Sequence, residues 1–501
     1  MRMPRDIGPF HILGIGGIGM SAIAEVLVDL GYTVQGSDQK DSANVRRLRQ
    51  KGIRVFIGHD PINLIGARLV VISSAVKDGN PELEAARTRR LPVITRAAML
   101  AELMRLTSTV SVTGTHGKTT TTSIVAHLFK VANLDPTVIT GGIINDWGTN
   151  ARVGKGDWMV VEADESDGTH ARLPTQIGVV TNIDPEHLDY YGTVERMEDS
   201  YRAFFDQIPF YGLAVAGIDH PVVRKMLDDL HVRENSRRVL SFGAAGDADL
   251  RLENMRTQGR SCVFDVVLSA RVPGGARALK DVTIHVPGHY NVLNALAAMA
   301  VAIEAGVSDA TIVSGLATFA GVKRRFQPTG TWNGVAIYDD YAHHPAEVSS
   351  VLKAAKDSLR TGTPGRVIAV FQPHRYTRVR DLFVEFANSF GDADTVIVTP
   401  IYTAGEHPIE GITHETIADG IRRAGHRAVL PIMHERELAP VLTQLAKPGD
   451  LVICLGAGTI TDWAHALPEW LRGPLPILSA QRSGNPQDRG LRAVGQRDTG
   501  T

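Results

Sequence analysis

The sequence of 501 residues contains only two cysteines, Cys262 and Cys454, which lie far apart. Two isolated cysteines exclude a disulfide framework and a cysteine-based metal cluster. An excess of one charge is also lacking, because 53 basic side chains balance 54 acidic ones to a net charge of −1. This balance gives no electrostatic footprint for nucleic acid or for an anionic membrane surface. Anionic ligands must therefore be bound at local sites, and a reducing, cytoplasmic compartment fits the cysteine count.

Long apolar runs are lacking as well. The most apolar segment, residues 10–28, follows Arg2 and Arg5 and so has the outline of a signal peptide. It is rich in glycine, however, and is interrupted by His11 and Glu25. A buried strand, a glycine turn and a helix explain it better. No other run approaches the roughly 18 apolar residues of a membrane span, so we expect no membrane insertion.

The length and the hydrophobic content of 43% predict about three domains of roughly 150 residues. Short apolar runs alternate with helical patterns, which predicts α/β domains with parallel sheets and crossover helices. We expect the domains over residues 1–107, 108–325 and 326–474. The stretch 235–287 alternates polar and apolar residues and predicts an antiparallel insertion in the central domain. Residues 475–501 have almost no apolar periodicity, and we expect a disordered tail there.

A glycine motif follows the first predicted strand. Gly14, Gly16 and Gly19 match the G-x-G-x-x-G pattern between a strand and a helix, which lets backbone amides approach a pyrophosphate. One alternative is a nicotinamide or flavin domain, in which Asp38 would bind a ribose. Another is a plain tight turn. We favour a ligand that carries a pyrophosphate.

A second motif runs from Gly114 to Thr119 between a predicted strand and a predicted helix. Val112 replaces the first glycine of the usual phosphate-binding loop, but Gly-Lys-Thr is retained. In such a loop, Lys118 neutralises phosphate charge and Thr119 is a Mg²⁺ ligand. The strand, turn and helix context predicts ATP binding.

Acidic and histidine-containing segments follow the next two strands. Glu162 begins a run of four acids in six residues at a strand end, where a carboxylate is well placed for Mg²⁺; the alternative is a solvated turn. His187 is either a metal ligand or a loop histidine, and nothing local decides between the two.

The last domain has two polar clusters, residues 339–345 and 372–378, each after a strand. Open α/β sheets bind ligands at the carboxyl ends of their strands. Arg375 and Arg378 suit a carboxylate, and the alternative is an exposed basic loop.

Seven motifs then occur in a fixed order over about residues 8–470. They are the glycine loop, Gly-Thr-His-Gly-Lys-Thr, Glu-Ala-Asp-Glu-Ser-Asp, Pro-Gly-His-Tyr-Asn-Val-Leu-Asn-Ala, Gly-Val-Lys-Arg-Arg-Phe, Tyr-Ala-His-His-Pro and Gln-Pro-His-Arg-Tyr-Thr-Arg. Together they resemble the Mur ligases, most closely the alanine-adding branch. The resemblance implies a Rossmann-like UDP-sugar domain, a P-loop-type ATPase domain with an antiparallel insertion, and a Rossmann-like C-terminal domain for amino-acid binding and closure.

The resemblance also implies the reaction and its participants. ATP and Mg²⁺, or Mn²⁺, would drive amide formation between UDP-N-acetylmuramic acid and L-alanine through an acyl phosphate, in cytoplasmic peptidoglycan synthesis. Arg202 stands where several later-acting relatives carry a carbamylated lysine, which fits the alanine-adding branch. The alternatives are a ligase that recycles an intact tripeptide, a nicotinamide-dependent oxidoreductase with an ATPase domain, and a non-catalytic nucleotide-sugar sensor.

Site residues are implied by position in the matched motifs. The expected catalytic residues are Lys118, His187, Arg325 and His343. The expected ATP-binding residues are Gly114, Thr115, His116, Gly117, Lys118, Thr119, Thr120, Asn291, Asn294, Arg325 and Asp340. The expected UDP-sugar-binding residues are Gly16, Gly17, Ile18, Gly19, Met20, Ser21, Ser37, Asp38, Ser73 and Ser74. The expected amino-acid-binding residues are Tyr341, His343, His374, Arg375 and Arg378, and the expected metal ligands are Thr119, Glu162 and His187.

Overall fold

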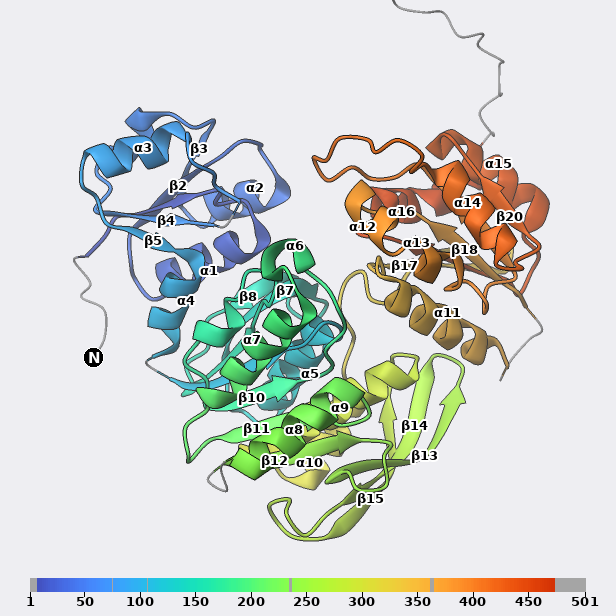
Figure 1. The fold of residues 1–501 in the computed structure, drawn as a ribbon, viewed down its shortest axis with the longest axis horizontal. Helices are drawn as coiled ribbons and strands as arrows, with labels where there is room; N and C mark the ends of the chain where they lie inside the picture. The colour runs from blue at the N-terminus through green and yellow to red at the C-terminus, as the bar shows by residue number, and fades with distance from the viewer. Residues whose placement is uncertain (1–6, 74, 106, 234–236, 361–364, 474–501) are drawn as a thin grey trace, which may run out of the picture.

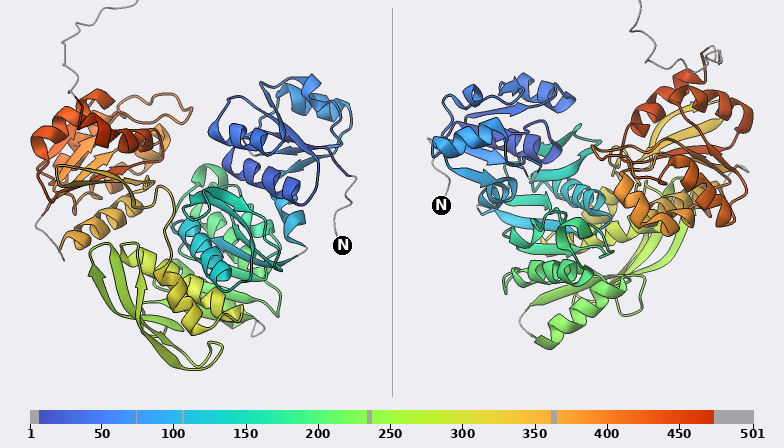
Figure 2. Two further views of the ribbon diagram at one scale, coloured as in Figure 1. Left: turned by 180° about the vertical axis from the view of Figure 1, so that it is seen from behind. Right: turned by 45° about the horizontal axis from the view of Figure 1, so that its top comes forward.

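The computed structural model describes residues 7–73, 75–105, 107–233, 237–360 and 365–473. These residues form three sheets of five, ten and six strands. Figure 1 shows the N-terminal and C-terminal sheets, with their helices, on opposite sides of the larger central unit, and Figure 2 shows the same arrangement from behind. The expected α/β fold with three domains is confirmed. The expected tail over residues 475–501 lies outside the described residues.

The N-terminal sheet is parallel, with strand order β3-β2-β1-β4-β5. Strand β1 lies between β2 and β4 and is buried along its whole length, as its continuous apolar run predicts. The elements are β1 (Phe10–Leu13), α1 (Ile18–Asp29), β2 (Val34–Asp38), α2 (Ala43–Gln50), β3 (Arg54–Ile57), the 3-10 helix η1 (Pro61–Leu64), β4 (Leu69–Ile72), α3 (Pro81–Thr88), β5 (Val93–Thr95) and α4 (Arg96–Met104).

The central sheet has the order β15-β14-β13-β12-β11-β10-β6-β9-β7-β8. Helices α5 and α9 pack together on one face of it, while α7 and α8 cover apolar residues on the other. Its elements are β6 (Ser108–Thr113), α5 (Lys118–Val131), β7 (Thr137–Ile144), β8 (Thr149–Arg152), β9 (Trp158–Glu162), the 3-10 helix η2 (His170–Arg172), β10 (Ile177–Val180), α6 (Leu188–Tyr191), α7 (Val194–Asp206), β11 (Leu213–Gly217), α8 (Pro221–Arg233), β12 (Arg238–Gly243), β13 (Leu250–Gln258), β14 (Ser261–Leu268), β15 (Arg277–Ile284), α9 (His289–Glu304) and α10 (Asp309–Ala317).

The antiparallel insertion is smaller than the stretch 235–287 predicted for it. Strand β12 pairs in parallel with β11 and therefore belongs to the parallel core. Among the described residues of this stretch, only the meander β13–β14–β15 is antiparallel; elsewhere in the sheet β7 and β8 also pair antiparallel. The sequence pattern assigned β12 to the insertion because β12 is an apolar strand that comes directly before the alternating strands.

The C-terminal sheet has the order β16-β17-β21-β18-β19-β20, with only its edge strand β16 antiparallel to its neighbour. Its elements are β16 (Gln327–Trp332), β17 (Val335–Asp340), α11 (Pro345–Arg360), β18 (Val367–Phe371), α12 (Tyr376–Asp381), α13 (Phe383–Ala387), β19 (Thr395–Val398), α14 (His414–Arg423), β20 (Val429–Pro431), α15 (Glu435–Leu445), β21 (Leu451–Leu455) and α16 (Ile460–Trp470). Within the described ranges, none of the helices is long and apolar enough to cross a bilayer.

The central domain contacts both of its neighbours. Helix α1 of the N-terminal domain packs on β7 and β8, and one apolar cluster joins the two domains. On the other side, Tyr290 of α9 packs against the apolar core of the C-terminal domain. The carboxyl ends of β9 in the central sheet and of β17 in the C-terminal sheet face one shared cleft.

Candidate functional site

The phosphate-binding loop connects β6 to α5, as the sequence predicts. Gly117 is the N-cap of α5 and has a φ of 85°, a left-handed conformation that favours glycine. A Cβ at this position would also collide with the side chain of Asn294 on α9. The backbone amides at the start of α5 are therefore exposed to a cavity, an arrangement that binds phosphate groups.

Lys118 lies at the centre of this loop. Its ammonium donates hydrogen bonds to the carbonyl oxygens of Gly114 and Thr115, at 2.7 and 3.0 Å, and to Glu165 Oε1 at 2.7 Å. Although burial opposes the charged form, the Glu165 carboxylate raises the pKa of Lys118. Lys118 is therefore a fully charged cation at neutral pH, held at the point where phosphate groups would lie.

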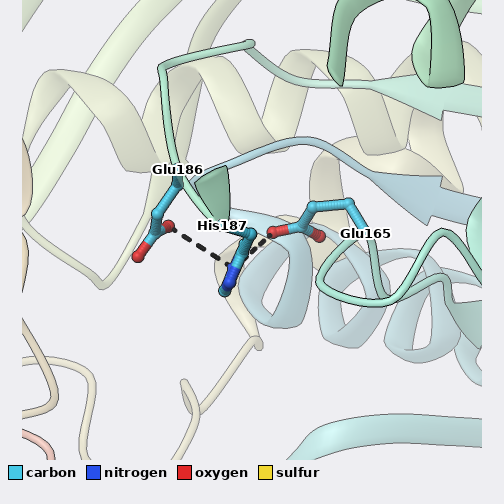
Figure 3. Close-up of side chains that lie close together, drawn as sticks. All are labelled: Glu165, Glu186 and His187. Carbon is cyan, nitrogen blue, oxygen red and sulfur yellow. Dashed lines mark ion pairs between the residues drawn. The ribbon is translucent and has the colours of Figure 1, made fainter. Parts of the chain in front are cut away.

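Two donor groups, each made of side chains whose oxygen or nitrogen atoms could bind a metal ion, flank Lys118. In the first, Glu162 accepts hydrogen bonds from the hydroxyl groups of Thr119 and Thr140, at 3.0 and 2.8 Å. In the second, His187 Nε2 lies 3.7 Å from Glu165 Oε1 and 3.8 Å from Glu186 Oε2 (Figure 3). The expected ligand His187 thus faces Glu165 and Glu186 more directly than it faces Glu162.

The second group fits a divalent cation on its chemistry. Its ligand atoms, one each from Glu165, Glu186 and His187, lie within 4.8 Å of one another. Glu165 Oε2 is buried and has no hydrogen-bond partner within the described part of the chain. The oxygen that faces His187 is Oε1, which accepts a hydrogen bond from Lys118, so a cation here would bind a carboxylate whose second oxygen is buried without a partner.

A cavity of about 230 Å³ lies between the central and C-terminal domains beside the phosphate loop. Phe242, Tyr290 and Leu293 provide apolar walls, and Asn294 and Asp340 provide polar groups. These walls suit the base and ribose of a nucleotide. The residues predicted to bind ATP that line it are His116, Gly117, Thr120, Asn294, Arg325 and Asp340.

Two residues expected to bind ATP, Asn291 and Gly114, do not line this cavity. Asn291 is buried and donates to the carbonyl oxygen of Pro287 at 2.7 Å. Gly114 offers its carbonyl to Lys118. Asp340 accepts backbone hydrogen bonds from Phe326 and Ala342, and burial raises its pKa to about 6 despite the nearby Arg325.

A cleft of about 660 Å³ joins all three domains and contains both donor groups. Ile18 and Asn44 reach it from the N-terminal domain, and Thr461 reaches it from the C-terminal domain. Of the residues predicted to bind the amino acid, the cleft is lined by Tyr341, His343 and Arg378.

His374 and Arg375, which are also expected to bind the amino acid, do not line the cleft. His374 stacks on Tyr402 and its ring lies 5.7 Å from that of His343. Arg375 pairs with Glu406 at 2.7 Å, and Arg378 pairs with Glu186 at 2.8 Å. The two arginines, which the sequence suggested as carboxylate ligands, thus have different carboxylate partners in the structure.

A third cavity, of about 860 Å³, lies at the carboxyl ends of the N-terminal strands. It is lined by the expected residues Gly16, Gly17, Ile18, Gly19, Met20, Asp38 and Ser73. Ser37 and Ser21 are buried, and their hydroxyl groups donate to Glu82 and to the carbonyl oxygen of Ile18. Ser74 lies outside the described residues.

Several polar residues of these cavities were not expected from the sequence. Glu165 lies in the Glu-Ala-Asp-Glu-Ser-Asp motif, three residues after Glu162, and Glu186 directly precedes His187. Arg96 lines the N-terminal cavity and pairs with Asp164 across the domain boundary at 3.1 Å. His59 follows β3 and has no local motif, so only the fold reveals it.

Comparison with known proteins identifies the family. A UDP-N-acetylmuramate–L-alanine ligase of Bradyrhizobium sp. is 56% identical to this chain over 94% of its residues and 99% of the relative. The chain belongs to the Mur ligase family. The models for the Mur ligase family catalytic domain, the Mur ligase middle domain and the Mur ligase glutamate ligase domain match residues 9–107, 112–302 and 324–458.

Further Mur ligases resemble the chain over nearly its whole length. The UDP-N-acetylmuramate–L-alanine ligase of Methylobacterium radiotolerans is also 56% identical, over 94% of this chain and 99% of the relative. The crystal structure of the UDP-N-acetylmuramate–alanine ligase of Thermotoga maritima has a TM-score of 0.75 at 28% identity and covers 92% of this chain and 99% of its own. The resemblance inferred from the seven motifs is confirmed.

Arg202 lies on α7 in ion pairs with Asp199 and Asp229.

Proposed function

We propose that this Mur ligase joins L-alanine to the lactyl carboxylate of UDP-N-acetylmuramic acid and converts ATP to ADP and phosphate, in peptidoglycan precursor synthesis. The observation that carries the proposal is the 56% identity, over nearly the full length, to proteins named for this reaction. The layout of the cavities supports it. A base-sized cavity, a phosphate loop and a nucleotide-sugar cavity meet at one cleft.

The chemistry begins with attack of the lactyl carboxylate on the γ-phosphate of ATP, which forms an acyl phosphate and ADP. The alanine amine then attacks the acyl carbon, and phosphate leaves. Lys118 and Arg325 line the cleft and neutralise the charge on the phosphoryl group as it is transferred. The three domains surround the cleft, which limits the access of water that would hydrolyse the acyl phosphate.

Mg²⁺ is the cation that we expect in this cleft. Thr119 and Glu162 would hold one ion at the start of α5, and His187 with Glu165 and Glu186 form a second group with suitable donors. When bound, Mg²⁺ neutralises phosphate charge. Glu165 would then release Lys118 to the phosphates.

His343 is the residue that we assign to hold the alanine ammonium. Its Nδ1 lies 2.8 Å from the carbonyl oxygen of Tyr341. Because a carbonyl only accepts, Nδ1 carries the hydrogen and Nε2 keeps its lone pair. Burial lowers the pKa of His343 to about 4, so the ring is neutral at pH 7 and its Nε2 can accept a hydrogen bond from the alanine ammonium.

The test measures ADP release with ATP, Mg²⁺ and UDP-N-acetylmuramic acid, together with L-alanine, an intact tripeptide, or neither. We expect release only with L-alanine. Release with the tripeptide alone would move the chain to the recycling branch of the family. No release in any mixture, while a known ligase is active in the same assay, would refute the proposal.

A further inference from the structure

Glu347 lies in the first turn of α11, and the proposed reaction does not use it. Its side chain is 13% exposed and lines both the base cavity and the central cleft. A nearly buried carboxylate between two ligand cavities requires partners, because burial of an unpaired charge is costly.

The two oxygen atoms of Glu347 have different partners. Oε2 accepts the backbone N–H groups of His343 and His344 at 3.1 and 3.3 Å, which satisfies free donors at the start of its own helix. Oε1 lies 3.2 Å from Nδ1 of His116 in the phosphate loop of the central domain and 4.0 Å from a guanidinium nitrogen of Arg325. One oxygen atom therefore caps the helix, and the other contacts the loop that holds Lys118.

His116 is held on its far side by the central domain. Its backbone N–H donates to Asn182 Oδ1 at 2.8 Å, and its Nε2 lies 3.2 Å from Asp184 Oδ2. The imidazole thus lies between two carboxylates, one from each domain. Although burial opposes the charged form, Asp184 and Glu347 raise the pKa of His116 to about 9. The contact therefore pairs opposite charges at neutral pH.

We propose that Glu347 is a positioning residue that fixes the orientation of the C-terminal domain on the phosphate loop by binding His116. The base cavity has walls from both domains, so this orientation sets its shape. Loss of the contact would weaken nucleotide binding and the alignment of the phosphoryl group, and would leave the nucleotide-sugar cavity unchanged. The role in turnover rests on the proposed function, but the role in nucleotide binding does not.

Glu347→Gln is the sharpest test. The glutamine oxygen still accepts the N–H groups at the helix start, while the charge facing His116 is lost. The set also includes His116→Gln, the double variant, and Glu437→Gln as a matched control. Glu437 is likewise a first-turn glutamate in the C-terminal domain, on α15, and it accepts the backbone N–H of Met433.

Two measurements are made on the full chain. The first is the dissociation constant for ADP by calorimetry, with the kcat and KM of the ligase reaction beside it. The second is the distance between spin labels on cysteines introduced at the exposed residues Glu195 and Arg436, one in each domain. The native cysteines, Cys262 and Cys454, are both buried and should not be labelled.

Each single variant should weaken ADP binding about tenfold and broaden the distance distribution, and the double variant should do no more than either one. The KM for UDP-N-acetylmuramic acid should stay at the wild-type value while kcat falls, and Glu437→Gln should match wild type throughout. Unchanged ADP affinity and distances in Glu347→Gln, or additive effects in the double variant, would overturn the proposal. If wild type binds ADP but has no ligase activity, the proposed function fails, and the ADP and distance data still decide the role of Glu347.

Discussion

At the scale of single residues, the site is a set of paired charges arranged before any ligand binds. Lys118 faces Glu165, Arg378 faces Glu186, and His116 lies between two carboxylates. Such pairs stabilise the buried charges and hold their side chains in place. Each pair also means that one residue must exchange partners when a substrate enters.

The Glu162→Gln variant tests the assignment of Glu162 as a metal ligand. Replacement by glutamine keeps a side chain of the same size but removes the charge beside Thr119, so we expect turnover to fall on the order of 100-fold and the Mg²⁺ requirement to rise. The rate of ADP release is measured against Mg²⁺ concentration, with circular dichroism to check the fold. Glu84→Gln, at an exposed position on α3, is the control. A wild-type rate and Mg²⁺ dependence would contradict the assignment.

Glu82 tests the electrostatics of the N-terminal domain. It is buried, and despite that burial the side chains of His11, Ser37 and Asn63 lower its pKa from 4.5 to about 2. Because the unfolded chain binds this proton more readily, the free energy of unfolding should fall by about 3 kcal/mol as the pH drops from about 4.5 toward 2.

Urea unfolding followed at several pH values between 7 and 2 measures this effect. Glu82→Gln should be less stable at pH 7 and should lose this part of the pH dependence. A variant with the same acid-induced slope as wild type would show that Glu82 does not cause it.

At the scale of elements, each functional group lies where a strand meets a loop or a helix. The phosphate loop ends β6, Glu162 ends β9, and Asp340 ends β17. Parallel strands bring the ends of β6 and β9 to one edge of the central sheet. Strand β17 lies in the C-terminal sheet, and Asp340 at its end lines the cavity between the two domains together with Gly117 of the phosphate loop.

Gly117→Ala tests the junction of β6 and α5. We expect the loss of at least a factor of ten in ADP affinity, because the new methyl group meets Asn294, together with a stability cost of about 1 kcal/mol from the left-handed φ. Gly52→Ala is the control, since Gly52 has a φ of 84° in open space. Calorimetry with ADP should show wild-type binding for the control alone; equal binding by both variants would refute the steric argument.

At the scale of the whole molecule, the reaction requires three domains because no single one encloses the cleft. We expect a nonhydrolysable ATP analogue together with UDP-N-acetylmuramic acid to draw the domains together. Small-angle X-ray scattering should show a smaller radius of gyration with both ligands than with neither, and Lys118→Met should reduce the change. An unchanged radius at saturating ligand would rule out closure as the means of excluding water.

The sequence by itself determined the elements, the phosphate loop, the glycine loop and the family. These features are local: a strand is set by an apolar run, a tight turn by its glycines, and a helix start by the residues around it. The apolar runs at residues 69–72 and 177–180 predict strands, and β4 and β10 have these bounds for this reason. The order of seven motifs added the family, because such an order does not arise by chance.

Only the tertiary structure decided which charges meet. It paired Lys118 with Glu165, directed His187 toward Glu165, gave Arg375 and Arg378 different carboxylate partners, and placed β12 in the parallel core. It also brought Glu347 of α11 to His116. The partners in these contacts come from different strands, helices or domains, and their distances depend on how sheets pack together. That packing is a property of the folded chain as a whole, so no local pattern of residues could have specified it.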